Sequence, residues 1–347
     1  MALHSKDRWP LPRVPGMMST DKAERSDRVP FALPRARQGR RWTPLVAASL
    51  VALAAFLLYR ILRPYSFDQL RASMAAIPSW RLASAGAFAA GSYLCLTGFD
   101  WLALRYVRRP LPYRRAALAS FVSLSLGHNI GFAGLSSGVI RYRFYSRWGL
   151  GAGDVARMIL FCGATVGLGL LILGGVALLA RGDLAHEITG LSRTAVAGLS
   201  ALCFLLTGSY VAAAWMRPRV RLRGIEVEMP PMRLALAQLV IGPLNFACVA
   251  GCLHETLAAA VSTPYLGVAS VYVIANLAGM ISHVPGGLGV IESVVTFLLP
   301  AANIVGAVLA FRFLYFLVPL ALGGILFAVA EIVFRSRGEG KRVVPPI

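Results

Sequence analysis

The chain has 347 residues, of which 57% are hydrophobic and 14% charged, and its mean hydropathy is +0.66. This composition excludes a soluble protein with a single core and indicates a polytopic membrane protein. The formal net charge is +20, but the basic residues lie beside apolar stretches and form no compact basic domain. We therefore expect membrane lipid, and no nucleic acid, as the partner.

The N-terminal segment, residues 1–41, is polar and rich in Pro and Arg. It lacks the apolar core and the small-residue cleavage site of a signal peptide. We expect it to be a disordered basic tail on the cytoplasmic side of the membrane. A second cytoplasmic tail is expected at 335–347.

Apolar stretches of two lengths follow the tail. A helix needs roughly 20 residues to cross about 30 Å of hydrocarbon. Stretches of that length lie at 44–62, 82–104, 155–180, 194–216, 233–253 and 303–334. Shorter stretches lie at 116–135, 265–283 and 288–300. We expect an all-α polytopic fold with about six full spans and two broken or re-entrant hairpins, which makes eight membrane segments.

The two halves of the chain share a pattern at an offset of 151 residues. Gly-Val-Ile at 138–140 recurs at 289–291, each time inside a Gly-rich break, and the same offset pairs the long apolar stretches. We expect a first membrane repeat at 42–181 and a second at 194–334. Internal symmetry with broken helices at matching positions is typical of transporters that bind substrate near the membrane midplane.

The distribution of Lys and Arg predicts the orientation, because cytoplasmic loops carry an excess of positive charge. If each hairpin leaves the membrane on the side that it entered, 28 of the 35 Lys and Arg residues fall in segments predicted to be cytoplasmic. Both termini are then cytoplasmic, and the second repeat is inverted relative to the first. Periodicity leaves open whether each hairpin is a short re-entrant loop or a pair of full spans.

The first break, 127–138, contains several glycines and leads into an arginine-rich segment. Irregular backbone at membrane depth survives only where protein or a water-filled cavity satisfies its polar groups. A helix that restarts near Ser137, with Ser136 or Ser137 as its cap, would direct free N–H groups at an anion. We assign Ser137, Gly138 and Arg141 to a substrate site in which Arg141 grips a phosphate through two N–H donors.

The alternative for the arginines is that they extend to the membrane surface beside aromatic side chains. We expect this of Arg143 and Arg147. Arg141 has an acidic counterpart in the second copy of the pattern, which favours a functional role for it.

The second break combines Pro285 with Gly286, Gly287 and Gly289. Proline blocks continuation of the preceding helix, and the glycines permit a turn. A half-helix that begins at 288 then places Glu292 in its first turns. Glu292 could serve only to stabilise the helix N-terminus, but an ionisable group in such an apolar stretch is a functional candidate. We assign these five residues to the substrate site.

Arg312 lies in an apolar stretch with no charge nearby in sequence. A bare charge at mid-span costs at least about 2.5–3.5 kcal/mol, so Arg312 should face Glu292 or Asp100. We include it in the substrate site, with a structural ion pair as the alternative. Asp100, beside Arg105, is interpreted as an interfacial residue, and His128 as a solvated turn residue.

Other chemistry has little support in the sequence. The five cysteines form no Cys-x-x-Cys motif, so no disulfide framework or metal site is expected. No nucleophile with a base, no paired carboxylates and no P-loop for ATP are found, and we expect no cofactor and no catalytic residue. A proton or ion gradient and passive scrambling both remain open as driving forces.

The segments 138–149 and 284–292, the latter reading Val-Pro-Gly-Gly-Leu-Gly-Val-Ile-Glu, resemble the lysylphosphatidylglycerol synthase transmembrane-region family over roughly 44–334. The resemblance implies a lipid flippase that moves an anionic or aminoacylated phospholipid between leaflets of the bacterial inner membrane. It points to Arg141, Gly286, Gly287, Gly289 and Glu292. The bifunctional members also carry a soluble aminoacyl-transfer domain, which we expect to be absent here, leaving the lipid cargo open.

Three functions therefore compete. The leading one is a non-enzymatic lipid translocator. The alternatives are a membrane-embedded transferase that modifies lipid headgroups and a membrane scaffold for a separately encoded lipid synthase. An assay of lipid movement would distinguish them. Lipid movement without chemistry would support the translocator, a changed headgroup would support the transferase, and neither result would support the scaffold.

Overall fold

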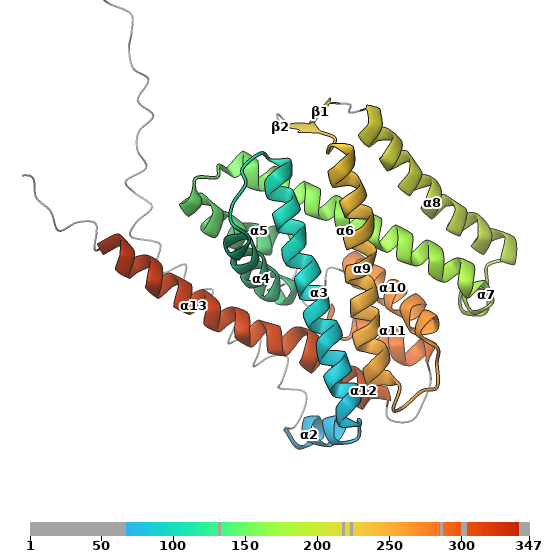
Figure 1. The fold of residues 1–347 in the computed structure, drawn as a ribbon. Helices are drawn as coiled ribbons and strands as arrows, with labels where there is room; N and C mark the ends of the chain where they lie inside the picture. Colours follow the sequence, from blue (N-terminus) through green and yellow to red (C-terminus); the bar gives the residue numbers. More distant parts are fainter. Residues whose placement is uncertain are drawn as a thin grey trace, which may run out of the picture. The chain divides into compact units, whose positions relative to one another are not determined.

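The computed structural model describes residues 67–130, 133–216, 219–222, 225–282, 284, 287–299 and 304–339, all within one compact unit (Figure 1). This part of the chain is helical apart from one short antiparallel ribbon. The all-α fold expected from the apolar stretches is therefore confirmed. The tail predicted at 1–41 and the first apolar stretch, 44–62, lie outside the described residues.

The elements follow the apolar pattern of the sequence. The first half contains α2 (Phe67–Ala75), α3 (Ser79–Tyr106), α4 (Tyr113–Ile130), α5 (Ala133–Tyr145), the 3₁₀ turn η2 (Ser146–Trp148), α6 (Ala152–Ala180) and α7 (Gly182–Thr189). The second half contains α8 (Arg193–Met216), β1 (Arg219–Leu222), β2 (Ile225–Glu228), α9 (Met232–Leu257), α10 (Tyr265–Ser282), α11 (Val290–Leu298), α12 (Ile304–Arg312), the π-helical segment η4 (Phe313–Leu317) and α13 (Val318–Glu339).

Six helices in the described part of the chain are long and apolar enough to cross a membrane, namely α3, α6, α8, α9, α10 and the continuous helix formed by α12, η4 and α13. Five of them coincide with long apolar stretches of the sequence. The sixth, α10, has 18 residues and was expected to be one arm of the second hairpin. A re-entrant path for that hairpin stays a prediction.

The first break, expected at 127–138, is mostly helical, because α4 ends at Ile130 and α5 begins at Ala133, whereas the second break lies between α10 and α11. In both cases the two helices that the break joins pack against each other, α4 against α5 and α10 against α11. The approach of α4 to α5 is close, because a Cβ atom on Gly127 would lie 2.7 Å from Cβ of Ser137. Glycine at this position therefore removes a steric block between the two arms of the first hairpin.

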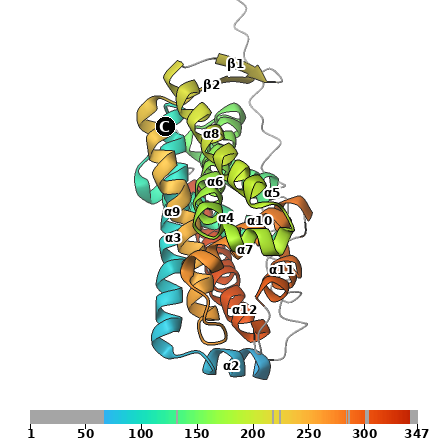
Figure 2. The same ribbon diagram turned by 90° about the vertical axis from the view of Figure 1, so that its right-hand side faces the viewer.

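The bounds of two pairs of helices lie close to the 151-residue offset. Shifted by that offset, α3 would span 230–257, and α9 spans Met232–Leu257; α4 would span 264–281, and α10 spans Tyr265–Ser282. The two related helices α3 and α9 also pack along each other, side by side in both views (Figures 1 and 2). The inverted repeat stays a prediction, and these bounds agree with it.

The helix 304–339 is interrupted by the widened segment η4. Pro319 has no N–H for the carbonyl of Tyr315, and its ring crowds that carbonyl, so the helix opens into π-helical turns there. The hydroxyl of Tyr93 on α3 donates to the carbonyl oxygen of Tyr315 at 3.4 Å. A neighbouring helix thus satisfies the backbone group that proline leaves without a donor.

Candidate functional site

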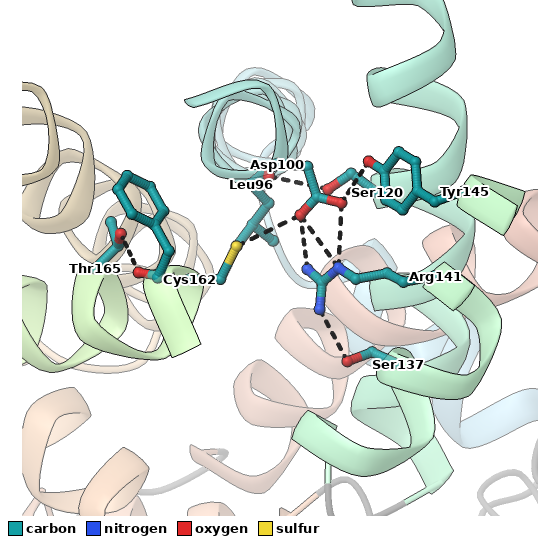
Figure 3. Close-up of polar contacts among 9 residues, drawn as sticks. Leu96, Asp100, Ser120, Ser137, Arg141, Tyr145, Cys162 and Thr165 are labelled. Carbon is teal, nitrogen blue, oxygen red and sulfur yellow. Dashed lines mark hydrogen bonds and ion pairs between the residues drawn. The ribbon is translucent and has the colours of Figure 1, made fainter. Parts of the chain in front are cut away.

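The first break is held by a buried ion pair between α5 and α3. Nη2 of Arg141 lies 2.8 Å from Oδ1 of Asp100, and Nε lies 3.1 Å from Oδ2 (Figure 3). Tyr145 donates its hydroxyl to Oδ2 of Asp100 at 2.8 Å, and Nη1 of Arg141 donates to Oγ of Ser137 at 3.1 Å. The thiol of Cys162 on α6 completes the group, 3.6 Å from Oδ1 of Asp100.

This ion pair is almost fully removed from solvent, with Arg141 4% exposed and Asp100 0% exposed. Removing two charges from water is costly, and their attraction offsets the cost only if further hydrogen bonds satisfy the remaining polar atoms. Tyr145, Ser137 and Cys162 supply such bonds here. The guanidinium is therefore already occupied by protein groups in this conformation.

Two predictions about the first break are wrong. Asp100 is not interfacial, because it lies five residues from Arg105 on α3, about 140° around the helix axis, and points into the protein. Ser137 is not a helix cap, because α5 begins at Ala133 and includes Ser137 in its second turn. Its hydroxyl instead accepts a hydrogen bond from Arg141, one turn further along the same helix.

Gly138, also in α5, faces Ile159 of α6. A Cβ atom on Gly138 would lie 2.8 Å from the Cδ1 atom of Ile159.

The second break is held by a different ion pair, between α11 and α12. Arg312, 2% exposed, forms a two-pronged ion pair with Glu292, in which Nη2 lies 2.7 Å from Oε2. The same Nη2 donates to the carbonyl oxygen of Gly287 at 2.6 Å. Arg312 thus has the partner that its buried charge requires, and it binds both the turn and the helix that follows it.

Left-handed backbone at two glycines shapes this turn. Gly287 has φ of 58° and Gly289 has φ of 79°, a region that favours glycine because it has no Cβ. Gly289 precedes α11, which begins at Val290, so Glu292 lies in its first turn as expected. Pro285 and Gly286, which the sequence also assigned to the substrate site, lie outside the described residues.

A third ionic contact was not foreseen. Arg143 lies 2.8 Å from Oε1 of Glu331 through Nε and 2.9 Å from Oε2 through Nη2. Arg147 lies 3.0 Å from the same carboxylate. The prediction that Arg143 and Arg147 extend free to the membrane surface is therefore wrong, because α13 brings the buried Glu331 against the end of α5.

The charged residues of the two breaks are not paired with each other. Arg141 pairs with Asp100 and Glu292 pairs with Arg312, so the two residues expected to share a headgroup have separate partners. The helix 304–339 contacts the second break through Arg312, and through Glu331 it contacts α5, the helix that follows the first break. Within the described residues, no group of three or more His, Cys, Asp or Glu side chains is placed to hold a metal ion.

Sequence reasoning missed Glu331 and Tyr145 and gave Asp100 a different role. Asp100 and Glu331 are acids inside apolar stretches, and the same argument that singled out Glu292 would have found them. Nothing in the sequence position of Tyr145 indicates that its hydroxyl binds a carboxylate. Only the packing of α5 against α3 shows this contact.

With this geometry established, comparison with known proteins identifies the family. The family model for the lysylphosphatidylglycerol synthase TM region matches residues 45–323. The chain belongs to this family. The resemblance carried by 138–149 and 284–292 is thereby confirmed, and the chain is a multi-pass membrane protein of the lysylphosphatidylglycerol synthase TM family.

Three relatives show the range of the family. The chain is 30% identical to the uncharacterized protein slr0712 of Synechocystis, over 84% of this chain and 92% of the relative. It is 29% identical to the inner membrane protein YbhN of Escherichia coli, over 69% of this chain and 77% of the relative. It is 22% identical to a phosphatidylglycerol lysyltransferase of Staphylococcus haemolyticus, over 86% of this chain but only 35% of that enzyme.

Proposed function

We propose that this protein moves a phospholipid between the leaflets of a bacterial inner membrane without altering its headgroup. Membership of the family and the relative described as a phosphatidylglycerol lysyltransferase support a lipid ligand. The relative described as an inner membrane protein supports the location. An anionic or aminoacylated phospholipid is the ligand class that we propose.

The observation that carries the proposal is the pair of buried ion pairs at the two breaks. Arg141 and Glu292, which correspond at the 151-residue offset, carry opposite charges, and each is paired with a charged residue from another helix, Asp100 and Arg312 respectively. Ionisable groups at membrane depth are costly and mark pathways for polar substrates. Each break therefore has a charged group that a passing headgroup needs and a protein partner that holds it when no lipid is present.

Exchange of partners would let a headgroup pass without leaving a charge bare. A lipid phosphate competes with Asp100 for the guanidinium of Arg141, and an amine competes with Arg312 for the carboxylate of Glu292. One ion pair replaces another in each case, so the desolvation penalty of an unpaired charge is avoided. Opening of an ion pair also releases the break that it holds.

The helix 304–339 would couple the two breaks. Arg312 and Glu331 are 19 residues apart, about 28 Å along a helix, which is close to the thickness of the hydrocarbon core. Arg312 holds the second break and Glu331 holds the helix that follows the first. The π-helical segment η4 lies between them, where the helix has wider turns and can bend.

Leaflet exchange in proteoliposomes tests this function. Purified protein is reconstituted with fluorescent phosphatidylglycerol, and the label accessible to a membrane-impermeant quencher is followed with time. Glu292→Gln should slow exchange about tenfold to a hundredfold, because a charged hydrogen bond of about 1.5–3 kcal/mol is lost from the rate-limiting state. Arg193→Gln is the control, since Arg193 and its partner Asp183 are both largely exposed.

A charge-swapped variant separates transport from stability. Glu292→Arg combined with Arg312→Glu retains an ion pair but reverses its direction, so it should fold better than either single variant and still exchange lipid slowly. Normal exchange by both Glu292→Gln and the swapped variant would refute the proposal. Mass spectrometry of the recovered lipid shows whether a headgroup has changed, and a changed headgroup would favour a transferase instead.

A further inference from the structure

A hollow of about 240 Å³ lies outside both breaks, lined by Tyr106, Val107, Arg108, Arg157 and Glu228. It lies where α3 ends, α6 begins and the β1–β2 ribbon folds back, near the top of Figure 1. The hydroxyl of Tyr106 fixes the ribbon there by donating to the backbone carbonyl of Glu228 at 2.6 Å. The hollow is smaller than the roughly 300–1,000 Å³ of pockets that enclose whole ligands, so it suits a headgroup.

The charges around the hollow are of both signs. Arg108 is 86% exposed and lies 3.7 Å from the carboxylate of Glu228, which is itself 42% exposed. Arg157, 38% exposed, pairs with Asp154 at 2.7 Å. The pair of Arg108 and Glu228 is exposed on both sides, and such ion pairs are weak and exchange readily with other partners. The hollow therefore presents two guanidinium groups and one carboxylate that a ligand with both charges can engage.

The backbone at Arg108 is the second observation. Arg108 has φ of 58°, and among the described residues it is the one non-glycine residue with positive φ. The N–H of Arg108 bonds to the carbonyl of Arg105, and the N–H of Arg109 bonds to the carbonyl of Leu104. This is the Schellman end of α3, at the position that glycine usually occupies. The fold thus carries a conformational cost that glycine would avoid, and in return it places a guanidinium at the rim of the hollow.

The surroundings match the headgroup level of a bilayer. Tyr106 is the last residue of the candidate span α3, where amphipathic aromatic residues mark the membrane surface. The residue before it, Arg105, lies over the ring of Trp101, with its Cζ atom 3.5 Å from the ring centroid. A lipid whose chains lie along α3 and α6 would have its phosphate at this depth.

We infer that the hollow binds the headgroup of a glycerophospholipid in which an amine follows the phosphate, the phosphate lying between Arg108 and Arg157 and the ammonium against Glu228. Charge-assisted hydrogen bonds at both ends favour this class over a headgroup that ends in hydroxyls. The inference rests on the proposed function only in taking the ligand to be a phospholipid. The distribution of Lys and Arg predicts that the loops at this end of α3 are cytoplasmic, so we expect the hollow to face the cytoplasm.

Binding, measured apart from transport, tests the inference. The purified protein is titrated with short-chain phosphatidylethanolamine, with short-chain phosphatidylglycerol and with free phosphoethanolamine. We expect about tenfold tighter binding of the amine-bearing lipid than of phosphatidylglycerol, and weak binding of phosphoethanolamine. Glu228→Gln should remove the preference between the two lipids. Arg108→Gly and Arg157→Gln should weaken both lipids about tenfold or more.

The variant Arg108→Gly separates an effect on lipid binding from an effect on folding. Because glycine suits a positive φ, the variant should unfold at the same temperature as the wild type or higher while binding lipid poorly. Arg114→Gln is the matched control, since Arg114 is an exposed arginine near the same end of the helices and its loss changes the net charge equally.

Three results would overturn the inference. If both Arg108→Gly and Arg157→Gln bind lipid as the wild type does, the hollow is not the binding site. If Glu228→Gln keeps the lipid preference, Glu228 does not bind the amine. Tight binding of free phosphoethanolamine would show that the site binds soluble phosphates. Absence of leaflet exchange in the wild-type protein would refute the proposed function and leave these binding results standing.

Discussion

The ion pair of Arg141 and Asp100 shows how a charge is accommodated inside this protein. The carboxylate of Asp100 on α3 accepts hydrogen bonds from side chains of two other helices, from Arg141 and Tyr145 on α5 and from Cys162 on α6. A buried pair of this kind contributes little net stability when it is intact, but loss of one partner leaves a bare charge. Its effect on stability is therefore best measured with both partners varied.

We predict that Asp100→Asn and Arg141→Gln each lower the free energy of unfolding by about 3–5 kcal/mol, because each leaves one buried charge unpaired. The double variant should recover much of that loss. Thermal unfolding of the purified protein in one detergent, read as a double-mutant cycle, measures the coupling. Additive losses in the double variant would show that the two side chains do not stabilise each other.

The contact of Glu331 with Arg143 and Arg147 yields a second prediction. Glu331→Gln should destabilise the protein by about 1.5–3 kcal/mol, because two charged hydrogen-bonding partners lose their acceptor. Arg143→Gln should also destabilise, although by less, since Arg147 still pairs with the carboxylate. Arg193→Gln, in an exposed pair, should change stability by at most about 1 kcal/mol. Equal melting temperatures for all three variants would contradict this assignment.

At the scale of elements, the crossing of α6 and α9 depends on two glycines. A Cβ on Gly169 of α6 would lie 2.7 Å from the carbonyl carbon and oxygen of Gly242 on α9. A Cβ on Gly242 would lie 2.7 Å from the carbonyl oxygen of Thr165. Small residues allow membrane helices to approach this closely, and packing gained by close approach drives their association. The buried side chain of Gln238 adds a hydrogen bond to Thr165 at the same crossing.

Gly169→Ala should therefore destabilise the protein by about 1–3 kcal/mol, because the methyl group meets backbone that cannot move aside. Gly167→Ala, two residues away on the same helix, has no atom within 4 Å of the added Cβ. It should be neutral or stabilise by up to about 1 kcal/mol, since alanine favours the helix. Melting temperatures of the two variants test this, and similar values for both would argue against a close crossing.

At the scale of the whole molecule, the orientation of the chain is the property that the charge pattern predicts most directly. The loops near Arg109 and Arg219 carry the positive charge expected of the cytoplasmic side, whereas the loop near Arg181 carries little. The candidate span α6 separates the loop near Arg109 from that near Arg181, and α8 separates the latter from the loop near Arg219.

Single cysteines introduced beside Arg109 and Arg219, in a background without the five native cysteines, should be protected from an impermeant thiol reagent in intact cells. A cysteine beside Arg181 should be labelled. Permeabilised cells provide the control, because all three positions should then react. Labelling beside Arg109 together with protection beside Arg181 would contradict the inverted arrangement of the two repeats.

Several features of this protein follow from local properties of the sequence. The helices of the described spans coincide with the apolar stretches because a helix is the way to satisfy backbone polar groups in lipid. The turn at Gly287 and Gly289 follows from residues that adopt positive φ. The need of Arg312 for an acidic partner follows from the cost of a bare charge. None of these depends on which helix lies beside which.

The choice of partners was decided only by the tertiary structure. Arg141 meets Asp100 across 41 residues of sequence, and Arg143 meets Glu331 across 188. Such pairs depend on the rotation of each helix about its axis and on the packing of α3, α5 and α13, which hydropathy does not encode. The sequence indicated the charges that need partners at membrane depth, and the packing of the helices determined which acid each arginine binds.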